Sequence, residues 1–302
     1  MGSPVSASPS VAGDGRFQPL AAASAEPAQT VLLRDGRVLA FCSYGDLDGR
    51  PMIYFHGGGS SRLEPAYADR YAARNRIRLI AIDRPGYGRS TPRQDYRFET
   101  VASDVLELAD TLRLDRFAVA GMSAGAGFAL HLARLAATRV SAVALINPSP
   151  DTRHPLWKRS PLIARLAIAA SSIPWLLNRA TRSLLQDPEK AAKSMVSRTG
   201  WSQESVEQFA AMTREGLRQS GGIAMLTMEA RMLLHTSWRL DWSAIRCPVL
   251  AICGIDDQAR GFYQLLAQQH PQLTTMDVPG PHMPIVAAQA WDRIGALLSS
   301  HP

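Results

Sequence analysis

Short apolar runs recur along the chain and predict the strands of one sheet. The first two, Val31–Leu33 and Val38–Tyr44, flank the tetrapeptide Arg-Asp-Gly-Arg at 34–37. An Asp-Gly pair between two strand-like runs predicts a β-hairpin. The later runs predict further buried strands, at Pro51–Phe55, Ile77–Ile82, Phe117–Ala120, Val140–Ile146, Pro248–Cys253 and Leu273–Val278.

Helical spacing of apolar residues occurs between these runs. Val101, Val105, Leu108 and Leu112 recur at spacings of four and three, which predicts an amphipathic helix with Thr100 as its cap. Further helices are predicted over Tyr67–Asn75, from about Phe262, and around Val286, Trp291, Ile294 and Leu298. A hairpin followed by repeated strand–helix units predicts an α/β fold, with a mostly parallel, doubly wound sheet and helices on both faces.

One long segment interrupts this alternation and divides the chain. Residues 151–240 have a mainly helical, apolar pattern that is broken by four prolines, and we interpret them as a helical insertion. Residues 30–150 and 241–302 then form the sheet-containing core. Residues 1–29 consist mostly of Ser, Ala, Pro and Gly, which cannot bury enough apolar surface to fold, so we predict a disordered tail.

Composition and charge narrow the classes of protein to which this chain can belong. The net charge of +7 is scattered and contains no basic run, so nucleic acid is not an expected partner. The three cysteines, Cys42, Cys247 and Cys253, fit no zinc spacing, and their odd number favours a reducing compartment. No apolar stretch is long enough for a membrane span, and the N-terminal segment lacks the positive charge of a signal peptide. We therefore expect a cytoplasmic protein without a metal site.

The segment Gly121-Met122-Ser123-Ala124-Gly125 carries the strongest chemical signal. It follows a strand-like run and precedes a run of helix-forming residues, so Ser123 lies in a sharp strand-to-helix turn. Glycines two positions before and after it avoid the clash that a Cβ would cause. The serine Oγ then projects at the carboxyl edge of the sheet, beside free N–H groups of a helix N-terminus. This is the context of a G-x-S-x-G nucleophile elbow.

Several motifs in this order together resemble those of one family, the α/β-hydrolases. The resemblance covers about residues 30–300 and rests on His56–Ser60, Asp83–Ser90, the elbow, Gly254–Asp257 and Gly280–His282. It implies an α/β-hydrolase fold with a helical cap, a serine hydrolase of the esterase type, and no cofactor. Asp83–Ser90 is similar to the family's tight turn after the fourth strand, and we interpret it as structural.

The resemblance also assigns a catalytic triad. In this fold the chain order is serine, acid, histidine, and His282 is the histidine that directly follows the last predicted strand. The family spacing from Gly254 selects Asp257 as the acid, with Asp256 and Asp151 as alternatives. By the same resemblance, the backbone N–H groups of Gly58 and Ala124 form the oxyanion hole.

These residues predict hydrolysis of a small to medium, apolar carboxylic ester through an acyl-enzyme. The apolar character of residues 151–240 favours such a small-molecule substrate. Hydrolysis of a C–C bond, a lactone or an amide, or cofactor-free perhydrolysis, would use the same triad and stays open. A non-catalytic binding protein on the same fold is the alternative from another class. The sequence leaves the substrate and the oligomeric state open.

Overall fold

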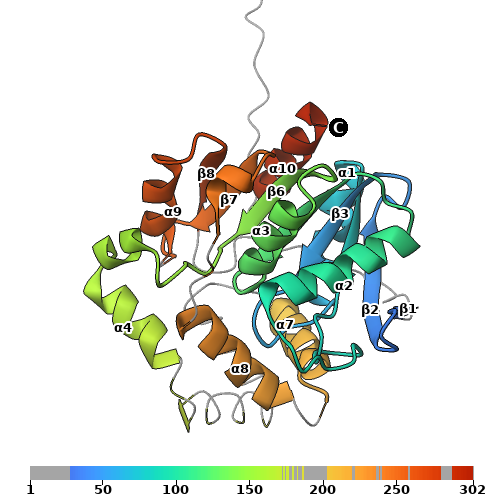
Figure 1. The fold of residues 1–302 in the computed structure, drawn as a ribbon, viewed down its shortest axis with the longest axis horizontal. Coiled ribbons are helices and arrows are strands. Elements are labelled where there is room, and N and C mark those ends of the chain that lie inside the picture. Colours follow the sequence, from blue (N-terminus) through green and yellow to red (C-terminus); the bar gives the residue numbers. More distant parts are fainter. Residues whose placement is uncertain are drawn as a thin grey trace, which may run out of the picture.

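The architecture is an eight-stranded, mostly parallel sheet covered by helices, seen in a computed structural model (Figure 1). The structure describes residues 28–301 except 172, 174, 177, 178, 180, 181, 183–185, 187–202, 220, 221, 236, 237, 239, 258 and 280–287. Most of the predicted tail and the whole loop of His282 therefore lie outside the described residues. The predicted α/β class with a doubly wound sheet is confirmed.

The strands follow the order β1-β2-β4-β3-β5-β6-β7-β8 across the sheet. β1 and β2 form the predicted antiparallel hairpin, β2 also pairs antiparallel with β4, and all later neighbours are parallel. The strands are β1 (Gln29–Leu32), β2 (Val38–Gly45), β3 (Arg50–Phe55), β4 (Ile77–Ile82), β5 (Phe117–Met122), β6 (Val140–Ile146), β7 (Val249–Gly254) and β8 (Leu273–Val278).

Helices connect the parallel strands and cover both faces of the sheet. The core helices are α1 (Asp69–Arg74), α2 (Phe98–Thr111), α3 (Gly125–Leu135), α9 (Arg260–Ala267) and α10 (Ala288–Ser300). The described helices between β6 and β7 are α4 (Leu162–Ser171), α7 (Gln203–Gly216) and α8 (Gly222–His235). Short 3-10 turns are η1 (Glu64–Ala68), η2 (Pro155–Arg159) and η3 (Trp242–Ala244). None of these helices has both the length and the apolar content that crossing a membrane requires.

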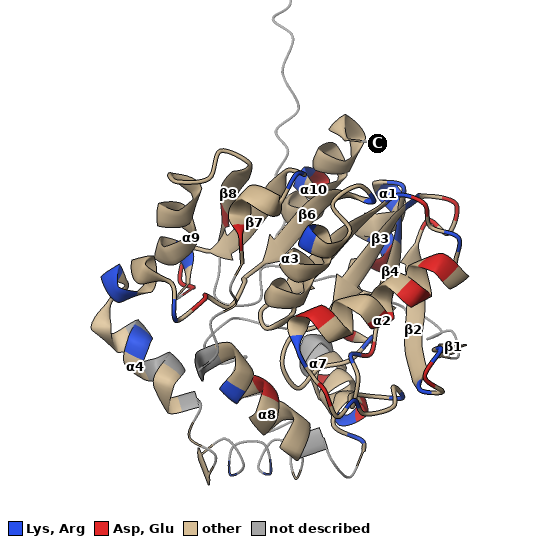
Figure 2. Cartoon of the chain, viewed as in Figure 1, with Lys and Arg blue, Asp and Glu red and all other residues tan. Residues whose placement is uncertain are grey.

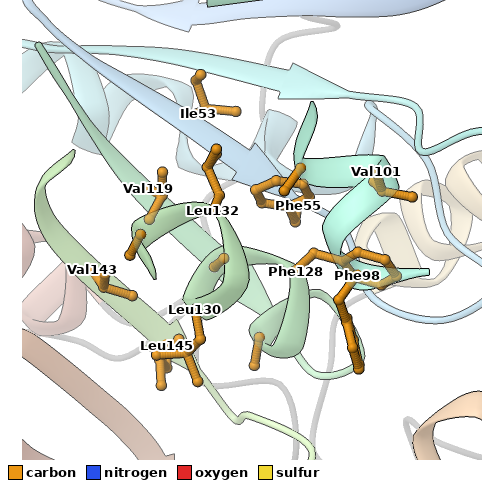
Figure 3. Close-up of a cluster of buried hydrophobic side chains, with 14 of the residues drawn as sticks. Ile53, Phe55, Phe98, Val101, Val119, Phe128, Leu130, Leu132, Val143 and Leu145 are labelled. Carbon is orange, nitrogen blue, oxygen red and sulfur yellow. The ribbon is translucent and has the colours of Figure 1, made fainter. Parts of the chain in front are cut away.

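Two apolar cores result from the alternation of side chains along the strands. Ile53 and Phe55 of β3 face α2 and α3, where they pack with Phe98 and Phe128 (Figure 3). Met52 and Tyr54 of the same strand belong to the other core, with α1 and α10. Because β3 to β6 are buried on both faces, their sequences contain nearly continuous apolar runs.

Two element boundaries differ from the prediction. β1 begins at Gln29, which was assigned to the tail but pairs with Phe41 in the hairpin. Thr100 was predicted to cap α2, but the helix begins at Phe98 with Arg97 as its N-cap, and Thr100 contributes to the cap from the third helical position, as in a capping box. Thr100 lies in the first turn, where its hydroxyl accepts the N–H of Arg97 at 3.1 Å.

The inserted segment comprises residues 147–248, between β6 and β7, and its described helices lie at one end of the sheet (Figure 1). The structure describes α4, α7 and α8 in it, in agreement with its helical pattern. The division into tail, core and cap over residues 1–29, 30–150 with 241–302, and 151–240 stays a prediction.

Candidate active site

Ser123 lies in the turn between β5 and α3, with a backbone φ of 49°. A non-glycine residue adopts such a φ only where its surroundings require it. The flanking glycines permit the turn: a Cβ on Gly121 would lie 2.5 Å from the carbonyl oxygen of Gly125. A Cβ on Gly125 would lie 2.2 Å from the carbonyl oxygen of Phe55. The predicted strand, sharp turn and helix are therefore all present around Ser123.

Backbone hydrogen bonds hold the turn to the loop that follows β6. The N–H of Ser123 donates to the carbonyl of Ile146 at 3.0 Å, and its carbonyl accepts the N–H of Ser149 at 3.0 Å. The Oγ atoms of Ser123 and Ser149 are 3.5 Å apart. The hydroxyl of Tyr263 on α9 donates to the Ser149 carbonyl at 2.9 Å. These hydrogen bonds hold the backbone of Ser123 in place, and its side chain is partly exposed.

The glycine loop, His56–Ser60, follows β3 and lies against this turn. A Cβ on Gly57 would be 3.6 Å from the Cβ of Ser123, and one on Gly58 would be 3.8 Å from the Cβ of Ala124. In the described part of the chain, neither the N–H of Gly58 nor that of Ala124 has an acceptor. The structure therefore brings together the two residues predicted to supply oxyanion donors.

Two buried side chains hold Gly57 from opposite sides. Its N–H donates to both carboxylate oxygens of Glu64, at 3.0 and 3.1 Å, and Tyr54 donates to the same carboxylate at 2.8 Å. Burial raises the pKa of Glu64. The carbonyl of Gly57 accepts from Nδ1 of His56 at 2.7 Å.

His56 is a neutral structural residue of this loop. Its Nε2 accepts the N–H of Arg84 at 3.2 Å, so the proton lies on Nδ1. Burial, and then the charge of Arg84, lower the pKa of His56 well below its ordinary value. With both ring nitrogens engaged, His56 has no free nitrogen to act as a general base.

Arg84 is buried among polar partners in the turn that follows β4. Its guanidinium donates to the Gly57 carbonyl at 3.0 Å, to the Tyr96 hydroxyl at 2.9 Å and to both carboxylate oxygens of Glu229. Glu229 also accepts the hydroxyls of Tyr87 and Tyr96, each at 3.0 Å. Burial by itself lowers the pKa of Arg84, but Glu229 and the two tyrosines more than offset this, and the pKa lies above its ordinary value.

The candidate acids occupy the loops after β6 and β7, at the same carboxyl edge of the sheet as Ser123. Asp257 is buried, with 9% of its surface exposed, whereas Asp256 is exposed. Oδ1 of Asp257 accepts the N–H of Ala259 at 2.7 Å. Asp151 is half-buried, which raises its pKa, and its carboxylate accepts the N–H of Arg153 at 3.0 Å.

The structure leaves one part of the predicted triad undescribed, because His282 lies within 280–287. It also adds two residues outside the motifs, Glu64 and Glu229, and gives a contact with the glycine loop to Arg84 of the Asp83–Ser90 turn. Glu64 and Arg84 follow the glycine loop and β4 closely, and that proximity was the available signal. Within the described ranges, no group of three or more His, Cys, Asp or Glu residues is arranged to hold a metal ion.

Comparisons with known proteins agree with this fold. A family model described as alpha/beta hydrolase fold matches residues 50–167. An esterase from Exiguobacterium antarcticum has a TM-score of 0.70 at 18% identity, covering 91% of this chain and 98% of that one. A hydrolase from Pseudomonas aeruginosa has a TM-score of 0.66 at 21% identity, covering 92% and 98%. The likeness to these solved structures shows that the chain has the α/β-hydrolase fold.

Sequence relatives with curated descriptions match shorter stretches. A non-heme chloroperoxidase from Streptomyces lividans is 32% identical over 123 residues, which is 40% of this chain and 45% of that protein. A probable proline iminopeptidase from Leptolyngbya boryana is 34% identical over 89 residues, or 28% and 27% of the two chains. The matches thus span less than half the length of these relatives.

Proposed function

We propose that this protein is a serine hydrolase that cleaves small to medium, apolar carboxylic esters. The observation that carries the proposal is Ser123 at φ 49° in the strand-to-helix turn, with Gly58 and Ala124 beside it. Ser123 attacks the ester carbonyl, and the N–H groups of Gly58 and Ala124 stabilise the negative charge that develops on its oxygen. The esterase from Exiguobacterium antarcticum among the similar structures supports the choice of an ester.

His282 takes the proton of Ser123 and passes it to the leaving alcohol, and then activates the water that cleaves the acyl-enzyme. Asp257 orients His282 and stabilises its charged form. The burial of Asp257 supports this role over that of exposed Asp256, because a carboxylate shielded from water interacts more strongly with the imidazolium. Cys42, Cys247 and Cys253 are all described and buried, and none forms a disulfide, which supports the proposal of a cytoplasmic protein.

A nucleophile variant tests the reaction. Ser123→Ala should lower kcat for p-nitrophenyl esters by about 10⁶-fold, because the triad acts as a unit. Intact-mass measurement should show that a fluorophosphonate adds once to the parent protein and not to the variant. A series of p-nitrophenyl esters of rising chain length then defines the acyl preference. Hydrolysis by Ser123→Ala at the parent rate would remove Ser123 from the mechanism.

A pair of adjacent carboxylates tests the assignment of the acid. Asp257→Asn should lower kcat by about 10⁴-fold, because His282 loses the group that selects its tautomer. Asp256→Asn is the matched control and should change kcat by less than about tenfold, since this side chain is exposed. The reverse pattern would move the role to Asp256, and full activity in both variants would move it to Asp151.

A further inference from the structure

A buried ion pair joins the inserted segment to the core directly behind the glycine loop. Arg84 follows β4 and Glu229 lies on α8, 145 positions later in the chain. Their side chains are 0% and 1% exposed. The guanidinium lies over the ring of Tyr87 at 4.9 Å and over that of Phe128 at 4.8 Å. Four parts of the chain therefore fix the plane of this guanidinium: the turn after β4, Tyr96, α3 and α8.

The fixed guanidinium also fixes one peptide group of the glycine loop. Arg84 donates to the Gly57 carbonyl at 3.0 Å. The carbonyl of Gly57 and the N–H of Gly58 belong to the same peptide unit, which is planar and trans, so they point in opposite directions. Holding the carbonyl on Arg84 consequently sets the direction of the Gly58 N–H.

Helix α8 reaches this peptide group itself. A Cβ on Gly58 would lie 3.5 Å from Oε1 of Glu229 and 3.8 Å from the Cβ of Ala124. Gly58 thus lies between the carboxylate of Glu229 and Ala124, the residue that precedes α3. A shift of α8 would release both the guanidinium and the backbone that it holds.

We propose that Arg84 and Glu229 are positioning residues for the oxyanion hole. Glu229 holds Arg84, Arg84 holds the Gly57 carbonyl, and the N–H of Gly58 is thereby aimed at the oxygen of the reacting ester. The inference rests on the proposed function, since it assumes that Gly58 is an oxyanion donor. If the inference is correct, the oxyanion hole is complete only when α8 is packed in its observed position.

A purely structural pair would behave differently, and this difference can be measured. Replacing both members of a buried ion pair by uncharged residues is often neutral or stabilising, whereas removing one member strands a buried charge. The double variant Arg84→Met with Glu229→Gln therefore separates folding from positioning. It removes both charges and also removes the guanidinium that donates to the Gly57 carbonyl, while the hydrogen bond from Nδ1 of His56 to that carbonyl stays.

The experiment compares the parent protein, Glu229→Gln, the double variant and the control Glu215→Gln. Glu215 on α7 pairs with Arg62 of the core and has no contact with Gly57 among the described residues. Readouts are Tm, kcat and KM for a p-nitrophenyl ester, and the rate at which a fluorophosphonate labels Ser123. The phosphoryl oxygen of this probe occupies the oxyanion hole, so its labelling rate reports on the same donors.

We expect Glu229→Gln to lower both Tm and kcat, and the double variant to recover Tm. In the double variant, kcat and the labelling rate should stay about 10- to 100-fold low, with KM changed by less than about threefold. Complete loss of one oxyanion donor costs about 10²- to 10³-fold in kcat, which bounds this effect. Glu215→Gln should lower Tm without changing kcat.

Two results would overturn the inference. If the double variant recovers kcat and the labelling rate together with Tm, the pair is structural only, and the proposed function survives. If the parent protein hydrolyses no ester and is not labelled, the proposed function fails and this inference fails with it.

Discussion

Helices α7 and α8 on one side of the inserted segment, and helix α4 on the other, meet the rest of the protein through different surfaces. α7 and α8 contact the glycine loop and the turn after β4 through buried polar groups. Arg62 of the core binds both Asp83 and Glu215. The amide of Gln219 donates to the carbonyls of Gly88 and Ser90, at 2.9 and 2.8 Å.

The backbones approach closely on this side as well. The N–H of Gly88 donates to the carbonyl of Gly216 at the end of α7 at 3.0 Å. A Cβ on Gly216 would lie 2.1 Å from the carbonyl oxygen of Ser60, so only glycine permits this approach. The end of α7 is therefore held at backbone distance from both loops.

Helix α4 presents apolar side chains to solvent instead. Leu162, Ile163 and Leu166 are 64%, 79% and 59% exposed. Residues 152–171 contain basic residues and no Asp or Glu. In Figure 2, α4 and the turn before it accordingly carry blue segments and no red ones. The described residues of α4 thus have no counterpart to the buried ion pairs of α7 and α8.

This difference shows which part of the inserted segment fixes the orientation of groups in the candidate active site. Hydrogen bonds between charged groups are directional and hold a backbone group in one orientation. Apolar contacts are not directional and leave the orientation less defined. The directional contacts lie on the side of Gly57 and Gly58, where the proposed reaction needs a fixed N–H.

Among the variants that test this comparison, one at Asp83 should lower the free energy of unfolding most. Asp83 holds Arg62, which also pairs with Glu215 on α7. Asp83 accepts the N–H of Arg62 at 2.7 Å, its guanidinium at 2.7 Å and the N–H of Arg89 at 2.9 Å. Asp83→Asn should lower the free energy of unfolding by about 3 kcal/mol, because it removes one member of a buried pair. Urea denaturation measures the change. Asp292→Asn is the control, since its pair with Arg74 is exposed and should contribute less than about 1 kcal/mol. Equal losses in the two variants would contradict the importance of burial.

A smaller effect on the free energy of unfolding is expected from protonation of His131 at acid pH. The ring of His131 stacks on Phe98 at 4.7 Å, and Phe98 contacts Trp238 of the inserted segment at 5.7 Å. Burial lowers the pKa of His131 to about 4. The unfolded chain, with a histidine pKa of about 6.5, therefore binds more protons below that pH, and stability falls as the pH falls from about 6.5 to 4.

The variant His131→Gln isolates this contribution. Between pH 7 and 5, it should lose about 2 kcal/mol less of its free energy of unfolding than the parent protein does. Urea denaturation at both pH values gives the comparison. Parallel pH dependences in the two proteins would show that His131 titrates normally in the folded state.

The smallest effect is expected on α4. Leu166→Ser should change the free energy of unfolding by no more than about 0.5 kcal/mol, because the side chain is already exposed. Leu233→Ser on α8 is the matched control, with 9% of the residue exposed, and should cost about 3 kcal/mol. A loss at Leu166 as large as that at Leu233 would mean that α4 is held to the protein as firmly as α8.

The sequence alone was sufficient to locate the strands of the sheet and the position of the elbow. Strands buried on both faces require continuous apolar runs, so β3 to β7 could be located within one or two residues. The sharp turn at Ser123 requires glycines at Gly121 and Gly125, and this requirement is visible as a local motif. Local conformational demands of this kind leave a local signal.

The surroundings of the glycine loop were decided only by the tertiary structure. Asp83–Ser90 was predicted to be a structural turn, yet its Arg84 binds both the Gly57 carbonyl and Glu229. Arg84 and Glu229 are 145 positions apart, and a buried arginine has the same letter in the sequence as an exposed one. Their pairing depends on packing α8 against the carboxyl edge of the sheet, because only that packing excludes water from both charges and makes them partners.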